Sequence, residues 1–223
     1  MFVSQSMTRK VITVAKDTPI LEARALMRQH HIRHLPVVAA DDHLVGIITD
    51  RDIRSVLPYK LAGGESDGQT EPDIARMTVS EVMTTTPVTI SPTHTLPDAL
   101  LLIQRSRVGA FPVVDEHGKL KGIISVRDLL RAFINVLGIG EPGTLLCILV
   151  ENKVGQLKRI VDLITEEGIS LGSVLVARYW EKDKRAVFPY LLTNNVINVK
   201  KRLREMGYTL LDPMEWYLDQ LPK

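Results

Sequence analysis

Residues 46–52 read Gly46-Ile47-Ile48-Thr49-Asp50-Arg51-Asp52, and residues 122–128 repeat them as Gly122-Ile123-Ile124-Ser125-Val126-Arg127-Asp128. In each copy the aliphatic pair is typical of the end of a buried strand, and the hydroxyl residue after it is typical of a helix N-cap. A strand that ends at a helix N-terminus leaves backbone N–H groups and a partial positive charge available to a phosphate. The aspartate three residues later adds a carboxylate that can accept two hydrogen bonds from a ribose diol. The pattern predicts a site for an adenine nucleotide.

A second interpretation of the same spacing binds no ligand. Ser/Thr-x-x-Asp also forms a capping box, in which the two side chains satisfy the first backbone N–H groups of a helix. A single copy would leave the two interpretations evenly matched. The ligand site is favoured because the whole unit around the stretch recurs with it.

The repeat extends well beyond the short stretch. An offset of 76 aligns residues 1–54 with residues 77–130 without a gap, and seventeen positions are identical. Such a match indicates a duplicated structural unit. Hydrophobic periodicity predicts the order strand, helix, strand, strand, helix in each unit. The expected elements are residues 11–14, 20–29, 35–38, 44–48 and 53–57 in the first unit, and 88–90, 96–104, 110–114, 120–124 and 129–137 in the second.

Composition limits the classes of function. The 223 residues are 45% hydrophobic and 24% charged, which is ordinary for a soluble globular protein. A net charge of +2 is too small to indicate a nucleic-acid partner. Cys147 is the only cysteine, so it can form no disulfide within the chain, and its apolar surroundings predict a buried strand residue. With neither a leader pattern nor a membrane-length apolar run, we expect a cytoplasmic protein without a membrane partner.

Two segments separate the predicted domains. Residues 58–76 contain three glycines among interspersed charged residues and predict a connector, with a lid over the ligand cleft as the alternative. The stretch 138–143 contains Gly-Ile-Gly-Glu-Pro-Gly and predicts a linker. The pattern changes after it, because residues 144–217 predict a βαββαβ order of ferredoxin-like type. The fold class is therefore α/β (α+β), with a duplicated unit followed by a different C-terminal domain.

The repeated unit resembles the cystathionine-β-synthase (CBS) domain. Both copies carry the Gly-h-h-Ser/Thr-x-x-Asp signature, an h-Pro-Val-Val strand and a Val-x-x-x-Met-Thr opening, where h is hydrophobic. The tandem resembles the Bateman module, which pairs two CBS domains about a pseudo-twofold axis, here residues 1–57 and 77–137. In that family the cleft between the domains commonly binds adenosyl ligands.

The resemblance implies roles for individual residues. Ribose and the first phosphate would be held by the two hydroxyl–aspartate pairs, which are Thr49 with Asp52 and Ser125 with Asp128. The adenine would lie between the apolar positions Ile32, Val108, Ile47 and Ile123. Two residues match a position near the base edge, namely Lys10 and Thr86.

The two expected sites differ in cations. Arg33 and His34 precede the Pro-Val-Val strand of the first unit, whereas Gly109 and Ala110 take those places in the second and offer no side-chain donor. Arg51 and Arg127 follow the two helix caps and can serve both sites. The first site is therefore better suited to a multiply charged phosphate chain. We expect no metal, because the histidines near this strand match no standard ligand spacing.

The C-terminal domain resembles the ACT domain, a regulatory module that often binds amino acids at a dimer interface. The resemblance lies in the βαββαβ order and in the loop residues Asn152, Gly155 and Leu157, although the usual aspartate of the family is Asn152 here. The alternative is that Gly155 only permits a tight turn. A CBS pair followed by an ACT-like domain resembles the acetoin-utilisation AcuB family over the whole chain.

These features predict a non-enzymatic, cytoplasmic sensor without a cofactor. It would bind an adenine nucleotide of the AMP, ADP or ATP class as a regulatory ligand and relay the signal through the ACT-like domain to a target protein. No catalytic triad or Walker loop is present in the sequence. We also expect a homodimer, by resemblance. The alternatives are an interaction module that binds no nucleotide, and a regulator that responds to an amino acid.

Overall fold

The computed structural model describes residues 1–57, 76–181 and 183–211. The predicted connector therefore lies outside the described residues except for Arg76, as does the predicted end of the C-terminal domain after residue 211. The chain forms two compact units, residues 1–130 and residues 131–223. The first unit contains both copies of the repeat, which we call the first copy (residues 1–57) and the second copy (residues 77–130).

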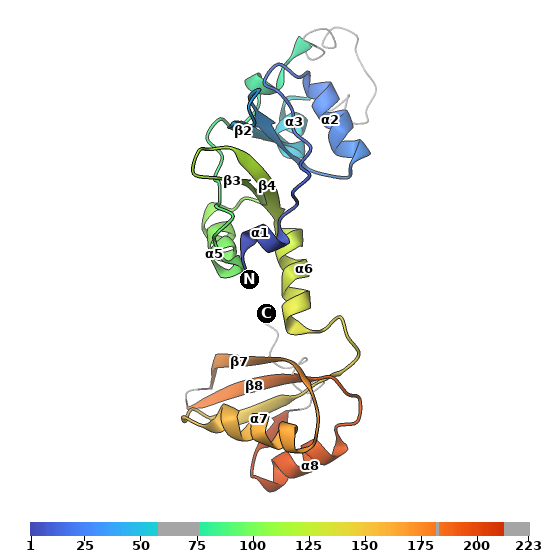
Figure 1. The fold of residues 1–223 in the computed structure, drawn as a ribbon, viewed down its shortest axis with the longest axis vertical. Helices are drawn as coiled ribbons and strands as arrows, with labels where there is room; N and C mark the ends of the chain where they lie inside the picture. Colours follow the sequence, from blue (N-terminus) through green and yellow to red (C-terminus); the bar gives the residue numbers. More distant parts are fainter. Residues whose placement is uncertain (58–75, 182, 212–223) are drawn as a thin grey trace. The chain divides into compact units, whose positions relative to one another are not determined.

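Both copies have the same arrangement of a helix, an antiparallel strand pair and a second helix (Figure 1). In the first copy these elements are α2 (Ile20–Gln29), β1 (His34–Val38), β2 (Leu44–Thr49) and α3 (Asp50–Val56). In the second copy they are α5 (Leu96–Ser106), β3 (Ala110–Val114), β4 (Leu120–Ser125) and α6 (Val126–Leu137), the last of which continues into the second unit. A short helical turn precedes each set, α1 (Val3–Ser6) and η1 (Val79–Glu81).

The strands predicted at residues 11–14 and 88–90 are wrong, because each is reduced to a single bridge. Val14 forms a parallel bridge with Val37, and Ile90 forms the equivalent bridge with Val113. Extending the first ladder would need a backbone N–H from Pro36 to Ile12, and proline has none. The conserved spacing of the repeat puts Pro112 in the same place in the second copy. The two prolines therefore end both ladders after one residue.

Each copy receives its opening segment from the other copy. The Val79 N–H, at the start of η1, donates to the Thr18 carbonyl at 2.9 Å, and the Val3 N–H, at the start of α1, donates to the His94 carbonyl at 2.8 Å. The Val79 side chain is fully buried in the core of the first copy. Burying a valine side chain stabilises a fold by about 1.5–3 kcal/mol. The two copies are thus interlocked and not simply adjacent.

The first glycine of each repeated stretch leaves room for the opening segment of the other copy. A Cβ on Gly46 would lie 2.7 Å from Sδ of Met83, and one on Gly122 would lie 2.6 Å from Sδ of Met7. Neither glycine is fixed by an unusual backbone angle, since neither has a positive φ. Close approach of the opening segment from the opposite copy therefore requires glycine at both positions.

The two copies are related by a local twofold axis. His43 and Lys119, which the offset of 76 makes equivalent, form an antiparallel bridge with each other. The hydrogen bonds on either side are also equivalent: the Leu44 N–H donates to the Gly118 carbonyl at 3.1 Å, and the Leu120 N–H donates to the Asp42 carbonyl at 2.9 Å. A pair of equivalent residues can face each other in this way only at a symmetry axis. The pseudo-twofold passes through the His43–Lys119 bridge.

The core of the first copy forms where α2 packs on the β1–β2 pair. Apolar side chains on α2 recur at Ile20, Ala23 and Met27, a spacing that places them on one helix face. They join the inward side chains of the strands. The buried members of this core are Val14, Ile20, Ala23, Met27, Leu35, Val37, Ile48, Ile53, Leu57 and Val79.

The second unit contains an antiparallel sheet with two helices on one face (Figure 1). Its elements are β5 (Thr144–Leu145), β6 (Cys147–Glu151), α7 (Gln156–Glu166), β7 (Leu171–Glu181), β8 (Lys184–Leu191), α8 (Ile197–Glu205) and β9 (Thr209–Leu211). Strands β5 and β6 lie along the same edge of β8, and β7 lies along its other edge. The spatial order is therefore β9-β6-β8-β7, as in a βαββαβ unit.

Alternating side chains of β6 separate the two faces of this sheet. Ile148 and Val150 face the helices and are buried with Ile160 and Ile164 of α7. The predicted linker at residues 138–143 packs against the same unit, because the Tyr190 hydroxyl donates to the Glu141 carbonyl at 2.5 Å. These contacts make the linker part of the second unit.

Candidate functional site

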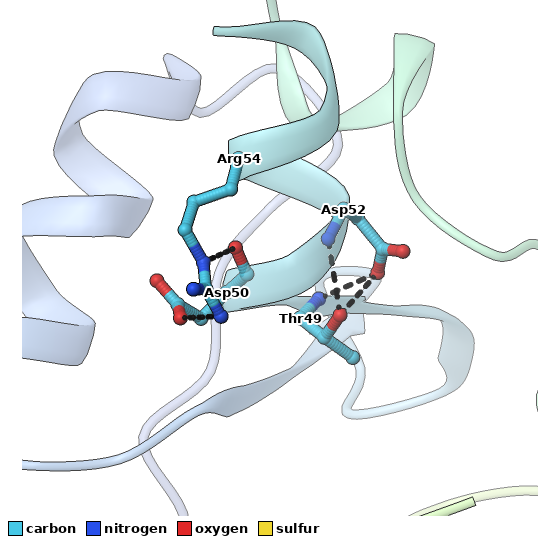
Figure 2. Close-up of polar contacts among 4 residues, drawn as sticks. All are labelled: Thr49, Asp50, Asp52 and Arg54. Carbon is cyan, nitrogen blue, oxygen red and sulfur yellow. Dashed lines mark hydrogen bonds and ion pairs between the residues drawn. The ribbon is translucent and has the colours of Figure 1, made fainter. Parts of the chain in front are cut away.

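The end of β2 and the start of α3 form a complete capping box, which we call the first corner (Thr49 to Asp52). Asp52 Oδ2 accepts hydrogen bonds from the Thr49 backbone N–H at 2.8 Å and from the Thr49 hydroxyl at 2.7 Å. The Asp52 N–H in turn donates to the Thr49 hydroxyl oxygen at 3.2 Å. Figure 2 shows these three bonds on one side of the carboxylate. The predicted capping box at Thr49 and Asp52 is therefore present.

Capping leaves part of the corner available for a ligand. Both bonds that the Asp52 carboxylate accepts from Thr49 use Oδ2, and the other carboxylate oxygen points away from Thr49 in Figure 2. No hydrogen bond joins that oxygen to another part of the described chain. A carboxylate oxygen accepts up to two hydrogen bonds, so it can still receive a ribose hydroxyl. Capping and ligand binding are compatible at Asp52.

The expected phosphate seat on the helix N-terminus needs a correction. Helix α3 has only seven residues, so its dipole is small. The Asp50 N–H already donates to the Arg33 carbonyl at 3.0 Å, and the Asp52 N–H is used by Thr49. The hydroxyl hydrogen of Thr49 is also donated to Asp52. The first corner therefore offers a phosphate fewer free backbone donors than the sequence pattern implied.

The same capping box occurs at two other helix starts. In the second corner (Ser125 to Asp128), the Ser125 hydroxyl donates to Asp128 at 2.6 Å. At the start of α5, the Thr95 hydroxyl donates to Asp98 at 2.6 Å, and this bond lowers the pKa of the exposed Asp98 carboxyl. A capping box by itself therefore does not mark a binding site. The surroundings of the first corner distinguish it from the box at α5.

A pocket of about 440 Å³ opens beside the first corner, a size suited to a small-molecule ligand. Side chains of both copies line it. From the first copy come Arg33, His34, Ile47, Thr49, Asp50, Arg51, Asp52 and Arg54. From the second copy come Thr84, Thr86, Pro87, Val88, Arg107, Val108, Gly109, Ala110 and Pro112.

The pocket gathers eight of the fourteen nucleotide-binding residues expected from the sequence. Those that line it are Arg33, His34, Ile47, Thr49, Arg51, Asp52, Thr86 and Val108. Those that do not line it are Lys10, Ile32, Ile123, Ser125, Arg127 and Asp128. Thr8 pairs with Ile123, which brings the chain before Lys10 to β4, the strand that ends at the second corner. Ile32 packs partly buried against the core of the first copy.

The expected residues are thus distributed crosswise between the copies. Thr84 exchanges two backbone hydrogen bonds of 2.9 Å with Ile47, which brings the segment before Thr86 against the first corner. Val108 reaches the same pocket from the end of α5. Gly109, identified in the sequence only as a missing donor of the second site, also lines this pocket.

Cationic side chains dominate the polar lining. Four arginines and one histidine accompany the two carboxylates. Sequence reasoning missed Arg54 and Arg107 among them. Arg54 Nη2 contacts Asp50 Oδ2 at 2.7 Å, and its Nε donates to the Asp50 carbonyl at 3.3 Å (Figure 2). The self-alignment contained a signal for the first of these, since Asp50 and Arg54 correspond to the apolar residues Val126 and Leu130.

His34 lies at the junction of the two copies. A Cβ placed on Gly109 would lie 3.4 Å from both Cε1 and Nε2 of the His34 ring, so the ring tip faces the second copy. Burial lowers the pKa of His34 from 6.5; nearby Asp52 opposes this shift, and Arg33 adds to it. The neutral imidazole therefore predominates at neutral pH. A bound anion would favour its protonated form.

Two other hollows have fewer charged side chains in their lining. One of about 550 Å³ is lined by residues 13–16, 38–40 and 45 of the first copy, and Lys16 is the only charged residue in that lining. Another of about 290 Å³ lies in the second unit beside Glu151, Arg159 and Lys184. Within the described ranges no group of three or more His, Cys, Asp or Glu side chains is placed to hold a metal ion. No helix among the described residues has the length and apolarity needed to span a membrane.

The expected ligand loop of the C-terminal domain is exposed. Asn152 and Gly155 lie between β6 and α7, and Leu157 is 42% exposed in the first turn of α7. Gly155 adopts φ +91° with no atom within 4 Å of the position of a Cβ. Glycine is therefore required there by the backbone angle and not by close packing. Cys147 is buried as predicted, and burial raises the pKa of its thiol to about 11.

Comparison with known proteins identifies the repeat. The CBS domain family model matches residues 3–59 and 79–135. A CBS domain-containing protein of Dictyostelium discoideum is 34% identical over 135 residues, which are 60% of this chain and 92% of that protein. An inosine-5'-monophosphate dehydrogenase of Korarchaeum cryptofilum is 35% identical over 121 residues, but these are 54% of this chain and only 22% of the enzyme. The similarity to that enzyme is confined to about a fifth of its length.

Solved structures are similar over the same part of the chain. A protein assigned to acetoin utilization (AcuB) from Vibrio cholerae is 30% identical with a TM-score of 0.52, covering 64% of this chain and 98% of its own. The protein CBSX2, solved in complex with AMP, is 26% identical with a TM-score of 0.51, covering 60% of this chain and 96% of its own. The family match covers just over half of the 223 residues, in two copies that the structure pairs about a twofold axis. The chain belongs to the CBS-domain family and carries its two domains as a tandem pair.

Proposed function

We propose that this protein is a non-enzymatic regulatory sensor that binds an adenine nucleotide in the pocket at the first corner. CBS pairs are typically regulatory and non-catalytic modules, which supports the regulatory role. One observation carries the proposal. Asp52, whose second carboxylate oxygen makes no hydrogen bond within the described chain, lines a pocket of about 440 Å³ that also contains apolar walls and four arginines.

Each part of a nucleotide has a chemical counterpart in this lining. Ile47 and Val108 offer apolar surfaces from opposite domains for the faces of a purine. The free oxygen of Asp52 accepts ribose hydroxyls through charge-assisted hydrogen bonds. Arg33 and Arg51 supply donors for phosphate oxygens, which the capped helix start does not. The AMP complex of the structurally similar CBSX2 supports the choice of ligand class.

Isothermal titration calorimetry with AMP, ADP, ATP, NAD and S-adenosylmethionine tests the proposal. We expect at least one adenine nucleotide to bind the parent protein, and Asp52→Asn to weaken that binding by roughly tenfold or more. Asp98→Asn is the matched control, because it alters the capping box of α5 outside the pocket. The proposal fails if none of these ligands binds at millimolar concentration. The chain would then be an interaction module without a nucleotide.

We extend the proposal to the C-terminal domain. Its βαββαβ order supports an ACT-like domain that relays the signal to a target protein, and both kinds of domain support a homodimer. Light scattering should return a species about twice the chain mass of 25.0 kDa. A thermal-shift screen with the twenty amino acids tests the alternative role as an amino-acid sensor. Stabilisation by one amino acid, lost in Asn152→Ala, would favour that alternative.

A further inference from the structure

We propose that the first pocket distinguishes nucleotides by their number of phosphates, through Arg107 from the second domain and Arg54, which Asp50 holds in the absence of ligand. This inference rests on the proposed nucleotide site. It adds the class of ligand, a nucleoside di- or triphosphate in preference to a monophosphate. It also assigns functions to three side chains that the repeated signature does not contain.

The backbone presents Arg107 to the pocket at some cost. Helix α5 ends at Ser106, and Arg107 follows it in the left-handed conformation with φ 57°. Residues other than glycine adopt this conformation uncommonly, because Cβ approaches the carbonyl oxygen. His31 occupies the equivalent place with φ 52°, so the turn is a property of both copies. Only Arg107 of this pair lines the pocket at the first corner.

A chain of contacts links the segment that contains Arg107 to the first corner. His34 pairs with Thr49 in the β1–β2 ladder, and the tip of its ring faces Gly109 of the second domain. Arg107 lies two residues before Gly109 in the same lining segment. A ligand held at Asp52 therefore meets the second domain through this segment. The phosphate chain of such a ligand would contact cationic side chains from both domains at once.

Arg54 already binds an oxyanion in this structure, the carboxylate of Asp50. The two side chains lie one helical turn apart, joined by the 2.7 Å contact, with the guanidinium side chain 60% exposed and the carboxylate side chain 31% exposed (Figure 2). Exposed ion pairs of this kind are weak. A phosphate presents the same kind of oxygen acceptors to a guanidinium and can replace the carboxylate. Asp50 is thus an internal competitor for the ligand.

Charge then makes the pocket selective. Each further phosphate adds negative charge and acceptor oxygens, whereas the ribose and base contacts remain the same. When a phosphate replaces Asp50 as the partner of Arg54, one more cation becomes available to the ligand, and Arg107 adds another. The second corner has Val126 and Leu130 at the positions of Asp50 and Arg54. It therefore lacks this ion pair and cannot select in the same way.

Calorimetry with AMP and ATP at constant ionic strength tests the inference in the full-length protein. Arg107→Gln should weaken ATP binding about tenfold and AMP binding less than about threefold. Asp50→Asn should strengthen ATP binding about two- to fivefold, since it frees Arg54 from a weak ion pair. Arg105→Gln is the matched control, because this arginine lies in the last turn of the same helix but outside the pocket lining. Thermal melting of each variant verifies that it is folded.

Two outcomes would overturn the inference while leaving the nucleotide site intact. Equal losses of AMP and ATP affinity in Arg107→Gln would show that this arginine does not respond to phosphate number. Unchanged or weaker ATP binding in Asp50→Asn would show that Asp50 does not compete with the ligand. Failure of the parent protein to bind any adenine nucleotide is a different result, and it contradicts the proposed function itself.

Discussion

The first and second corners of this CBS pair have the same local structure and different surroundings. Thr49 with Asp52 and Ser125 with Asp128 form the same three capping hydrogen bonds, with distances that agree within about 0.1 Å. Around the first corner, however, the pocket contains four arginines and a histidine. At the second, Gly109 and Ala110 replace Arg33 and His34 in the sequence.

The comparison separates two functions of one motif. Its glycine, hydroxyl and aspartate build the corner and receive the opening segment of the other domain, so they are the same in both copies. If the proposed site binds a nucleotide, a difference in affinity between the two corners would come from residues outside the motif, such as Arg33 and His34, which have diverged. Duplication has therefore preserved the scaffold and allowed one site to specialise in its charge.

The largest expected effect tests the shared scaffold. In Gly46→Ala the new Cβ would lie 2.9 Å from the Thr84 carbonyl oxygen, and in Gly122→Ala it would lie 2.9 Å from the Thr8 carbonyl oxygen. Overpacking of this kind costs about 1–3 kcal/mol, so urea unfolding should show similar losses in both variants. Gly140→Ala is the control, because no atom lies within 4 Å of its Cβ position. Equal stability of all three variants would contradict the interlocked packing.

The next effect breaks the equivalence of the two corners. Asp52→Ala removes charge-assisted hydrogen bonds worth about 1.5–3 kcal/mol and should weaken ATP binding by at least roughly tenfold. Asp128→Ala should weaken it less, because Gly109 and Ala110 take the places of Arg33 and His34 at the second corner. Calorimetric titration of both variants measures the difference. An Asp128→Ala variant with the larger loss would assign the principal site to the second corner.

A smaller effect isolates the contribution of capping. Asp98→Ala removes the box at α5, which lies outside the pocket, and should cost about 0.5–2 kcal/mol of stability with unchanged nucleotide affinity. Asp52→Ala should lose similar stability in addition to its affinity. Thermal melting and titration of the two variants give both quantities. Loss of affinity in Asp98→Ala would show that the ligand responds to global stability and not to the carboxylate at Asp52.

The smallest effect is the pH dependence of His34. Its folded-state pKa lies below 6.5 because of burial, so below that pH the unfolded chain binds more protons than the folded protein. Stability should therefore fall as the pH is lowered through this region. His34→Gln should remove that part of the slope, measured by urea unfolding at about pH 7.5 and about pH 5.5. An unchanged slope in His34→Gln would assign the dependence to other groups.

His34→Gln also tests the difference in charge between the first and second corners. A phosphate bound beside His34 favours the imidazolium, so ATP binding should take up protons near pH 6 in the parent more than in His34→Gln. Calorimetry in buffers of different ionisation enthalpy measures this uptake. The second copy offers no equivalent group, since Ala110 occupies that position.

The sequence by itself determined the duplication, the helices and hairpins, and the capped corners. These features are local: the spacing of Ile20, Ala23 and Met27 specifies a helix face, and Thr49 with Asp52 specifies a helix start. The sequence also identified eight of the seventeen residues that line the pocket. Each of these predictions depends on residues a few positions apart. Their spacing can be recognised in the sequence without knowledge of the rest of the fold.

Only the tertiary structure decided which domain completes which site. The segment that ends at Thr84 pairs with β2 of the first domain, and Val108 and Arg107 reach the same pocket from the second. It also ended the predicted strands at residues 11–14 and 88–90, because the prolines of the neighbouring strand have no N–H to donate. Such pairings join residues far apart in the chain, and hydrophobic periodicity reports only near neighbours. The charge of the first pocket is therefore a property of the assembled pair.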